Sequence, residues 1–417
     1  MRRLRSHFAV RWAALGPWGS DAVLYGCAAT FAVLLALTSN QTAQLRWGYL
    51  SAGPYILGAL LAVGAGRRLF RREHLARLAL LALVGLGTVV IPLALEVRWR
   101  DAQPEVGVIQ RSGAFLSKGQ DPYRTYDKHG RLVNTISGRP AFESFFPYFP
   151  LMGVFGLPSA ATRQSKGLTD ARIVMTLMTL AVSGAALALA KMTRDQKLRV
   201  AQVLLVLPTG ALFLATGGDD MPILALSLLG VAALQRRQSN LAGISFGLAA
   251  AMKLTAWPIA AGALLVARDH RGVSTWKRVL GWMGAIILVT TIPFLWRAPA
   301  AFVTNVFAFP LGLAGVASPA ASDLPGHLLT TWVPALGHVL APVTLLVGSY
   351  FVTRYARRHW PLSLSRLLAV LSVSVAVVIS VASATRIGYV IYPINFALWS
   401  AVTAPSVVEV PELVLQP

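Results

Sequence analysis

The chain has 417 residues, of which 55% are hydrophobic and only 13% are charged. Its mean hydropathy of +0.61 leaves too few polar side chains to cover a water-soluble surface, which excludes an ordinary soluble enzyme. In a soluble domain the formal charge of +22 would indicate nucleic acid, but the basic residues stand in short clusters between apolar segments, as the positive-inside rule describes. We therefore predict a polytopic membrane protein with no nucleic-acid partner.

Apolar segments long enough to cross a bilayer recur along the chain, and each crossing helix needs about 20 residues. The first contains Cys27, and a single cysteine excludes both a disulfide within the chain and a cysteine metal site. This segment is expected to remain as an uncleaved span, because no small-residue cleavage site follows it closely. The clearest predicted spans are residues 21–38, 50–66, 78–96, 171–191, 199–215, 221–235, 276–295, 336–354, 363–383 and 389–404.

Residues 240–268 are also apolar, but they carry Lys253 and Pro258 near their midpoint. Basic clusters flank this segment on both sides, so a single span would place one cluster outside, against the positive-inside rule. Two short helices that meet at Lys253 keep both clusters inside. We therefore predict a helical hairpin here and about 12 transmembrane helices in all, with both chain ends in the cytoplasm.

This topology predicts one membrane domain over residues 1–417, with a long extracytoplasmic loop at 97–170 and a second at 296–335. Asp and Glu contribute little to membrane orientation, so their concentration on one side indicates another cause. Ten of the 16 acidic residues fall at or beyond the outer ends of the predicted spans. They are Glu96, Asp101, Glu105, Asp121, Asp127, Glu143, Asp170, Asp219, Asp220 and Asp323.

The long loop has patterned segments. Val106, Ile109, Phe115 and Leu116 are spaced for an amphipathic helix lying on the membrane surface. The following "GQDPY" predicts a turn, which Asp121 is placed to cap. The aromatic and proline-rich "FFPYFPLMGVFGLP" suits an irregular interfacial or re-entrant run, where the aromatics either line a substrate or serve as plain interfacial side chains.

These segments resemble the first periplasmic loop of glycosyltransferase family 87, in which an acidic residue precedes a helix and an aromatic-proline run. Here the pattern runs from Glu105 to Pro150. Later motifs extend the resemblance to Pro393 in the family's order. "GGDDMPILALSLLGVAAL" is similar to a Gly-containing loop that opens a span, "LAGISFGLAAAMKLTAWP" to a hairpin with Lys at its outer tip, and "ATRIGYVIYP" to the last outer loop.

The resemblance implies an all-α polytopic membrane protein with the C-type glycosyltransferase fold and a structured first outer loop. The family includes polyprenyl-phosphomannose-dependent mannosyltransferases and arabinofuranosyltransferases of actinobacteria. It implies a multi-pass plasma-membrane enzyme that moves a sugar, mannose in the first instance, from a polyprenyl phosphate to a lipid-linked or cell-envelope glycan on the extracytoplasmic side. No metal or other cofactor is expected, because Lys and Arg can stabilise a departing lipid monophosphate.

Inverting transfer from a lipid phosphate needs a carboxylate that deprotonates the acceptor hydroxyl. Glu105 matches the family's first-loop acid and is the predicted base, with Asp101 as the nearest substitute. The family usually has Asp soon after the first span, whereas Glu105 follows the third predicted span; two extra spans leave it on the same side. The family also usually has Gly-Gln-x-Asn where this chain has Gly-Gly-Asp-Asp, so Asp219 and Asp220 are open to substrate-binding or structural roles.

The departing phosphate needs cations at the same surface. Lys253 is a candidate, because a lysine within an apolar hairpin is costly and usually has a partner or a function; the alternative is snorkelling to the headgroups. Arg386 is placed either to hold the phosphate through two hydrogen bonds or to pair with an outer acid. The remaining substrate-binding candidates, each also suited to a plain structural role, are Arg111, Asp121, Tyr123 and His327.

Two other classes stay open: a transporter or flippase of a lipid-linked sugar, and a non-catalytic scaffold in envelope assembly. A transporter needs charged residues near mid-membrane on both halves of its path, whereas these carboxylates gather on one side and no internal repeat is evident.

The segment "TGGDDMP" predicts a turn between spans, because glycines permit a tight reversal of the chain and acids favour the N-terminus of the helix that follows. Beyond that, one of its acids is expected to orient sugar hydroxyls or to pair with Lys253.

Overall fold

The computed structural model describes residues 15–67, 72–123, 140–162, 167–271, 273–316, 320–383 and 385–404. Asp127 and the basic N-terminal segment, both used in the sequence predictions, lie outside these residues. Within the described ranges the chain is helical, apart from loops and one isolated bridge between Ala321 and Thr385.

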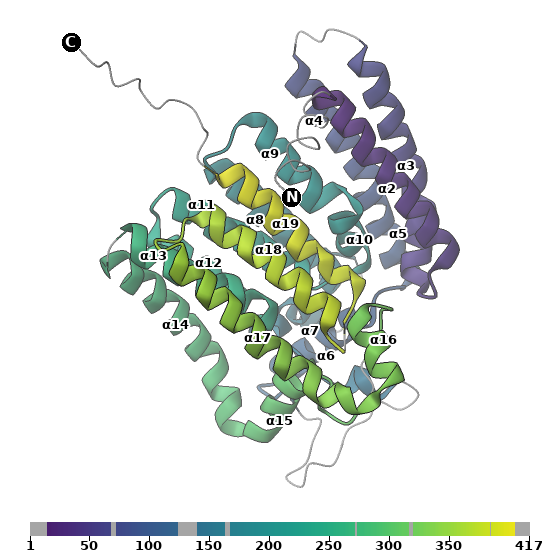
Figure 1. The fold of residues 1–417 in the computed structure, drawn as a ribbon. Coiled ribbons are helices and arrows are strands. Elements are labelled where there is room, and N and C mark those ends of the chain that lie inside the picture. Colours follow the sequence, from purple (N-terminus) through teal and green to yellow (C-terminus); the bar gives the residue numbers. More distant parts are fainter. Residues whose placement is uncertain are drawn as a thin grey trace, which may run out of the picture.

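The first three apolar segments form a group of long helices at one side of the molecule (Figure 1). The first two of them approach closely at Gly48, where an added Cβ would lie 2.7 Å from the Ala32 carbonyl oxygen. The elements are α2 (Gly16–Thr38), α3 (Thr42–Gly66) and a continuous run of α4 (Glu73–Gly85), η1 (Leu86–Val90) and α5 (Ile91–Trp99).

The segment between α5 and α8 folds onto the helices as short elements. Its first helix is the predicted amphipathic one, but Val106 and Ile109 are buried against the protein and do not lie on a membrane surface. Gly113 of this helix meets Gly156 so closely that a Cβ would lie 2.2 Å from the Gly156 carbonyl carbon. The elements are α6 (Pro104–Leu116), η2 (Ala141–Ser144), η3 (Pro150–Gly156), α7 (Leu157–Thr162) and η4 (Gly167–Thr169).

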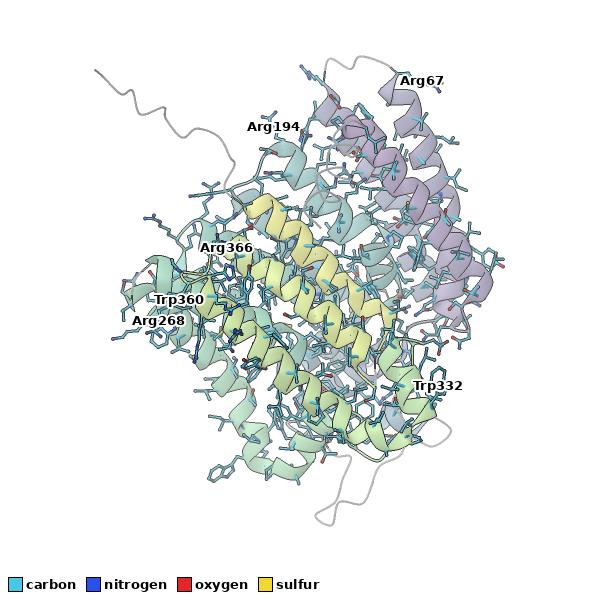
Figure 2. The ribbon with its side chains drawn as sticks, in the orientation of Figure 1. Arg67, Arg194, Arg268, Trp332, Trp360 and Arg366 are labelled. Carbon is cyan, nitrogen blue, oxygen red and sulfur yellow. The ribbon has the colours of Figure 1, made fainter. Side chains whose placement is uncertain are left out.

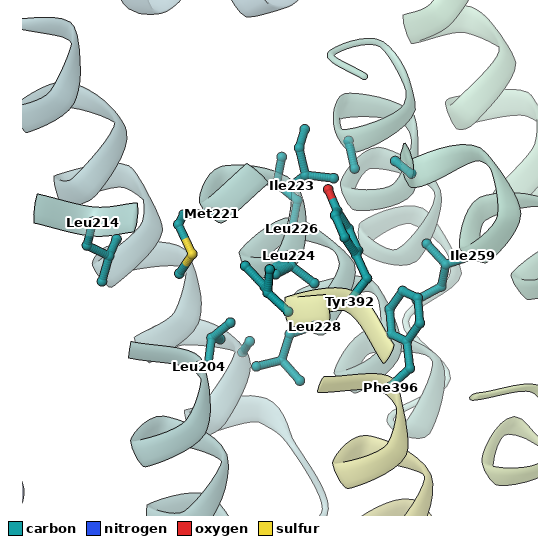
Figure 3. Packing of buried hydrophobic residues seen from close by; sticks show 14 of the residues in the cluster. Leu204, Leu214, Met221, Ile223, Leu224, Leu226, Leu228, Ile259, Tyr392 and Phe396 are labelled. Carbon is teal, nitrogen blue, oxygen red and sulfur yellow. The ribbon is translucent and has the colours of Figure 1, made fainter. Parts of the chain in front are cut away.

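The core surrounds α11, which is apolar on every side and almost entirely buried. Figure 3 shows its leucines facing Leu204 and Leu214 on one side and Ile259 and Tyr392 on the other. In chain order, α11 and its neighbouring elements are α8 (Ala171–Leu189), α9 (Arg194–Ala201), η5 (Gln202–Val206), α10 (Pro208–Thr216), α11 (Asp220–Gln235), α12 (Ser239–Ala250), η6 (Leu254–Ala256) and α13 (Trp257–Arg271).

Two of the predicted apolar segments are interrupted in the structure. The predicted span 199–215 is bent by 44° at Pro208, which has no N–H to continue the helix. The predicted break at Lys253 is present and separates α12 from α13.

The C-terminal part completes the bundle, and its last two helices lie side by side (Figure 1). Its elements are α14 (Val273–Arg297), α15 (Pro299–Val303), η7 (Thr304–Ala308), α16 (Pro325–Trp332), η8 (Pro334–Leu336), α17 (Gly337–Arg358), α18 (Leu364–Val381), η9 (Ile387–Val390) and α19 (Ile391–Thr403).

The outer helix faces are apolar. Leu60, Val289 and Leu346, on three different helices, are 65%, 74% and 71% exposed, as expected for side chains that meet lipid. Among the described residues, six helices are long and apolar enough to cross a membrane, or seven if the bent pair counts as one span. Five further apolar helices of 10–17 residues lie in the described part of the chain, and α11, which is buried, is one of them. The structure therefore agrees with an all-helical polytopic membrane protein.

Candidate active site

The turn between α10 and α11 is fastened to the start of α6. Gly217 ends α10 with a φ of +97°, and a Cβ there would lie 2.2 Å from the Val106 side chain. The Gln103 side chain donates a hydrogen bond of 2.7 Å to the Thr216 hydroxyl, and its N–H donates one of 3.1 Å to the Thr216 carbonyl. The glycine thus lets the following carboxylates lie beside the helix that carries Glu105.

Replacing Gly217 with Ala should lower the free energy of unfolding by about 1–3 kcal/mol, because the new methyl group overlaps Val106 and the backbone is left-handed. Denaturant unfolding in detergent would measure the change. Gly184→Ala in α8 is the matched control, since its Cβ meets no atom within 4 Å, and it should be neutral or slightly stabilising. Equal stability of both variants would contradict the close approach of α6 to this turn.

Lys253 is the centre of a buried ionic cluster. Its Nζ lies 3.1 and 3.0 Å from the two carboxylate oxygens of Asp219 and 2.7 Å from Oδ1 of Asp220. The same Asp220 oxygen accepts a hydrogen bond of 2.6 Å from the Tyr392 hydroxyl, which lies 2.7 Å from the Thr255 hydroxyl. The Lys253 side chain is only 10% exposed. It is therefore paired with both acids of the turn, and snorkelling to headgroups is not what satisfies it.

The charge state of Lys253 follows from these contacts. Burial by itself lowers the pKa of the ammonium group, but the carboxylates of Asp219 and Asp220 outweigh burial and raise the pKa well above its usual range. Lys253 thus carries its charge at neutral pH. One cation against two carboxylates leaves this cluster with a formal charge of −1 when both acids are ionised.

A second ion pair joins Glu105 of α6 to Arg386, which precedes η9. Arg386 Nη1 donates to Glu105 Oε1, and the side chains are 25% and 14% exposed. Burial opposes the guanidinium charge, but Glu105 outweighs it and raises the pKa of Arg386. Glu105 Oε2 is buried and has no hydrogen-bond partner among the residues that the structure describes. The carboxylate is therefore held through one oxygen and keeps lone pairs on the other.

Two tyrosines connect the ion pair to the lysine cluster. Lys253 Nζ lies 5.6 Å from the ring centroid of Tyr148 and 5.4 Å from that of Tyr389, within the range of cation–π attraction. Burial raises the pKa of the Tyr148 hydroxyl well above its usual value, and the negative charges of Asp219 and Glu105 raise it further. Asp219 and Glu105 therefore both act electrostatically on Tyr148, and the two groups of charges are neighbours.

The aromatic run reaches this site because it is folded into the protein. The Tyr123 hydroxyl donates a hydrogen bond of 2.8 Å to the Tyr148 carbonyl. The next residue, Phe149, donates its N–H to the Met252 carbonyl at 3.0 Å and stacks on Trp257 with ring centroids 5.6 Å apart. The loop that carries Tyr148 is thus attached directly to the residue before Lys253.

The other predicted residues of the first loop make contacts outside this cluster. Arg111 donates to the backbone carbonyl of Glu143, and Asp121 Oδ1 accepts a hydrogen bond of 2.8 Å from the Tyr123 N–H. The latter bond is the turn cap that the "GQDPY" pattern predicts. Tyr123 itself is fully buried and packs against Phe302 with ring centroids 5.1 Å apart. Because Tyr123 lies behind Tyr148, it is better placed to support the site than to contact a substrate.

Two further candidates are engaged in links between elements. His327 Nδ1 lies 3.0 Å from the Ser383 carbonyl oxygen, which ties α16 to the end of α18. Asp101, the substitute for the predicted base, pairs with Arg46 at 3.1 Å. The five residues that the structure brings together are Glu105, Asp219, Asp220, Lys253 and Arg386.

Sequence reasoning missed Thr255, Tyr389 and Tyr392 as individual members of the site. A usable signal was present, because Arg386, Tyr389 and Tyr392 are spaced by three residues and so share one face of a helical segment. Thr255 follows Lys253 closely and belongs to the segment that resembles the family's hairpin.

A comparison with known families identifies the family of this chain. Residues 146–381, more than half of the chain, match glycosyltransferase family 87. The matched range includes Asp219, Asp220 and Lys253 and runs to the end of α18, whereas Glu105, Arg386 and Tyr392 lie outside it. A comparison with curated proteins gave no match. On the family match and the apolar helical architecture together, the chain belongs to glycosyltransferase family 87 and is a membrane glycosyltransferase.

Proposed function

We propose that the protein transfers a sugar, mannose in the first instance, from a polyprenyl phosphate to a hydroxyl of a lipid-linked or cell-envelope glycan. Family membership supports a lipid-linked donor. The observation that carries the proposed chemistry is Glu105, whose Oε1 is held by Arg386 while the buried Oε2 has no partner among the described residues. A carboxylate held in this way is suited to accept a proton.

Glu105 acts as the general base. Its Oε2 takes the proton of the acceptor hydroxyl as the acceptor oxygen forms a bond to the anomeric carbon of the sugar. The bond between that carbon and the phosphate oxygen breaks on the opposite face, and its electron pair leaves with the lipid phosphate. The products are the lengthened glycan, the polyprenyl phosphate and a protonated Glu105.

Arg386 connects the base to the leaving group. Before reaction its charge is balanced by Glu105 at the other end of the ion pair. Once Glu105 is protonated, that balance is lost and the guanidinium can stabilise the negative charge that develops on the phosphate. The two alternatives predicted for Arg386, pairing with an acid and binding phosphate, thus become successive states of one residue.

Asp219 and Asp220 bind the sugar in this proposal, and Lys253 holds them in place. When both acids are ionised, the cluster has a formal charge of −1 and repels a phosphate, so in this proposal Lys253 is less suited to the leaving group than its position in the sequence indicates. Ionised carboxylates accept hydrogen bonds from sugar hydroxyls without any change in their protonation state. The family's usual Gly-Gln-x-Asn would present amides at this place, whereas this chain presents charges neutralised in part by the lysine.

The site faces the extracytoplasmic side in this proposal, and the chain crosses the membrane about 12 times, with α11, α12, α13 and α19 as short inner spans. Support comes from the basic residues. Arg67, Arg194, Arg268 and Arg366 lie along one edge of the molecule and Trp332 lies at the other (Figure 2). By the positive-inside rule the arginine edge is cytoplasmic, and the turn at Asp219 lies at the opposite ends of α10 and α11.

The test is transfer of labelled sugar in membranes that contain the full chain. Polyprenyl-phosphomannose should give a labelled glycan, and the corresponding arabinofuranosyl donor should not. Transfer from the arabinofuranosyl donor alone would replace mannose in the proposal. Translocation of either donor without any glycan product would support a flippase and contradict transfer chemistry.

A further inference from the structure

A cavity of about 340 Å³ lies at the far end of α12 from Lys253. It is lined by Arg237, Gln238, Ser239, Asn240, Leu241 and Arg278. The α12 helix has 12 residues, so at 1.5 Å per residue the cavity is about 18 Å from the site at the other end. It is therefore separate from the residues proposed for sugar transfer.

The sequence of α12 explains why this cavity has an arginine on each side. Gly243 and Gly247 stand one turn apart on α12 and face α14. A Cβ on Gly243 would lie 2.8 Å from the Val279 carbonyl oxygen and 2.9 Å from Trp282 Cβ. The helices can approach this closely only because both α12 positions are glycine. This contact brings the start of α12 beside Arg278 of α14.

The cavity lining is cationic, and its two arginine side chains make no ion pairs or hydrogen bonds within the described residues. Arg237 and Arg278 are exposed, and neither guanidinium has an ion-pair or hydrogen-bond partner among the residues that the structure describes. Gln238 precedes α12 without making a side-chain cap, so the first N–H groups of the helix point toward the same space. Ser239, which is 9% exposed as a residue, adds a hydroxyl that has no hydrogen-bond partner within the described part of the chain.

We propose that this cavity binds the phosphate group of an anionic phospholipid. Two arginines, a hydroxyl and a free helix N-terminus are the groups that recognise phosphate oxygens. A lipid is favoured over free phosphate because Arg278 begins the lipid-facing part of α14, where Leu280 and Trp282 are 38% and 46% exposed. Acyl chains can lie along these side chains while the headgroup fills the cavity.

The experiment uses the purified full chain, delipidated in a neutral detergent and titrated with phosphatidylglycerol, phosphatidylcholine or inorganic phosphate, with bound lipid counted by native mass spectrometry. Phosphatidylglycerol should bind best. The variant Arg237→Gln/Arg278→Gln should bind it at least about tenfold more weakly, because charged hydrogen bonds are lost. Asn240→Trp, which fills the cavity without changing its charge, should weaken binding as well.

Arg357→Gln/Arg358→Gln is the matched control, since it removes two exposed arginines from the end of α17. This variant should bind phosphatidylglycerol like the unmodified chain. Equal loss in both double variants would show general surface attraction and overturn the site. Binding of inorganic phosphate with no preference for lipid would overturn the lipid as ligand, and unchanged binding in the Arg237→Gln/Arg278→Gln variant would overturn the cavity altogether.

Discussion

Replacing Glu105 with Gln should lower the rate of sugar transfer by about 10²- to 10⁴-fold, the usual contribution of a general base. The amide fills the same space and can still accept the Arg386 hydrogen bond through its oxygen, but it cannot take the acceptor proton. Glu105→Asp should retain part of the activity, because a carboxylate remains on a side chain shorter by one methylene. Initial rates with a labelled lipid-phosphate donor would measure both variants.

Two controls separate catalysis from folding. Asp323→Asn removes an exposed acid from the second loop and should leave the rate unchanged. Asp101→Asn removes the nearest alternative base and should affect stability through the lost Arg46 pair more than the rate of transfer. Full activity of Glu105→Gln, with Asp101→Asn inactive but folded, would move the base to Asp101 and overturn our assignment.

Replacing Lys253 with Met should lower the free energy of unfolding by about 3–5 kcal/mol, the usual cost of removing one partner from a buried ion pair. The reason is that Asp219 and Asp220, whose side chains are 6% and 10% exposed, lose the cation that both contact. Denaturant unfolding in detergent would measure the loss. Lys118→Met, at an exposed position just after α6, is the control and should stay within about 0.5 kcal/mol of the unmodified chain.

The triple variant Lys253→Met/Asp219→Asn/Asp220→Asn tests what the cluster is for. Removing all three charges should restore most of the lost stability, because no unpaired charge remains buried. Sugar transfer should stay low, since the carboxylates proposed to hold the sugar are gone. A triple variant that transfers sugar at the normal rate would show that the cluster is only structural.

The positions of the helices were largely predictable from the sequence. The predicted span 171–191 is observed as Ala171–Leu189, and 276–295 as Val273–Arg297. The break at Lys253 was also predictable, because a charge and a proline in an apolar segment are incompatible with one straight span. The bend at Pro208 was not predicted, although the proline was visible, since hydropathy is continuous through it.

The first loop was harder to predict. Its helix was expected on a membrane surface, because Val106 and Ile109 form an apolar stripe, and an apolar stripe looks the same whether lipid or protein covers it. In the structure, the contact of Gly113 with Gly156 turns this helix into the protein. Two glycines separated by more than 40 positions carry no local signal of such an encounter.

By itself, the sequence determined that this protein belongs in a lipid bilayer, the approximate positions of its long helices, and a set of nine candidate residues that includes Glu105, Asp219, Asp220, Lys253 and Arg386. These follow from composition and local pattern, because charge in an apolar segment is costly wherever the chain runs. Only the tertiary structure decided that Lys253 is paired with two carboxylates and that Arg386 is paired with Glu105. Residues 281 positions apart meet only through packing, and the local sequence pattern carries no signal of such a pairing.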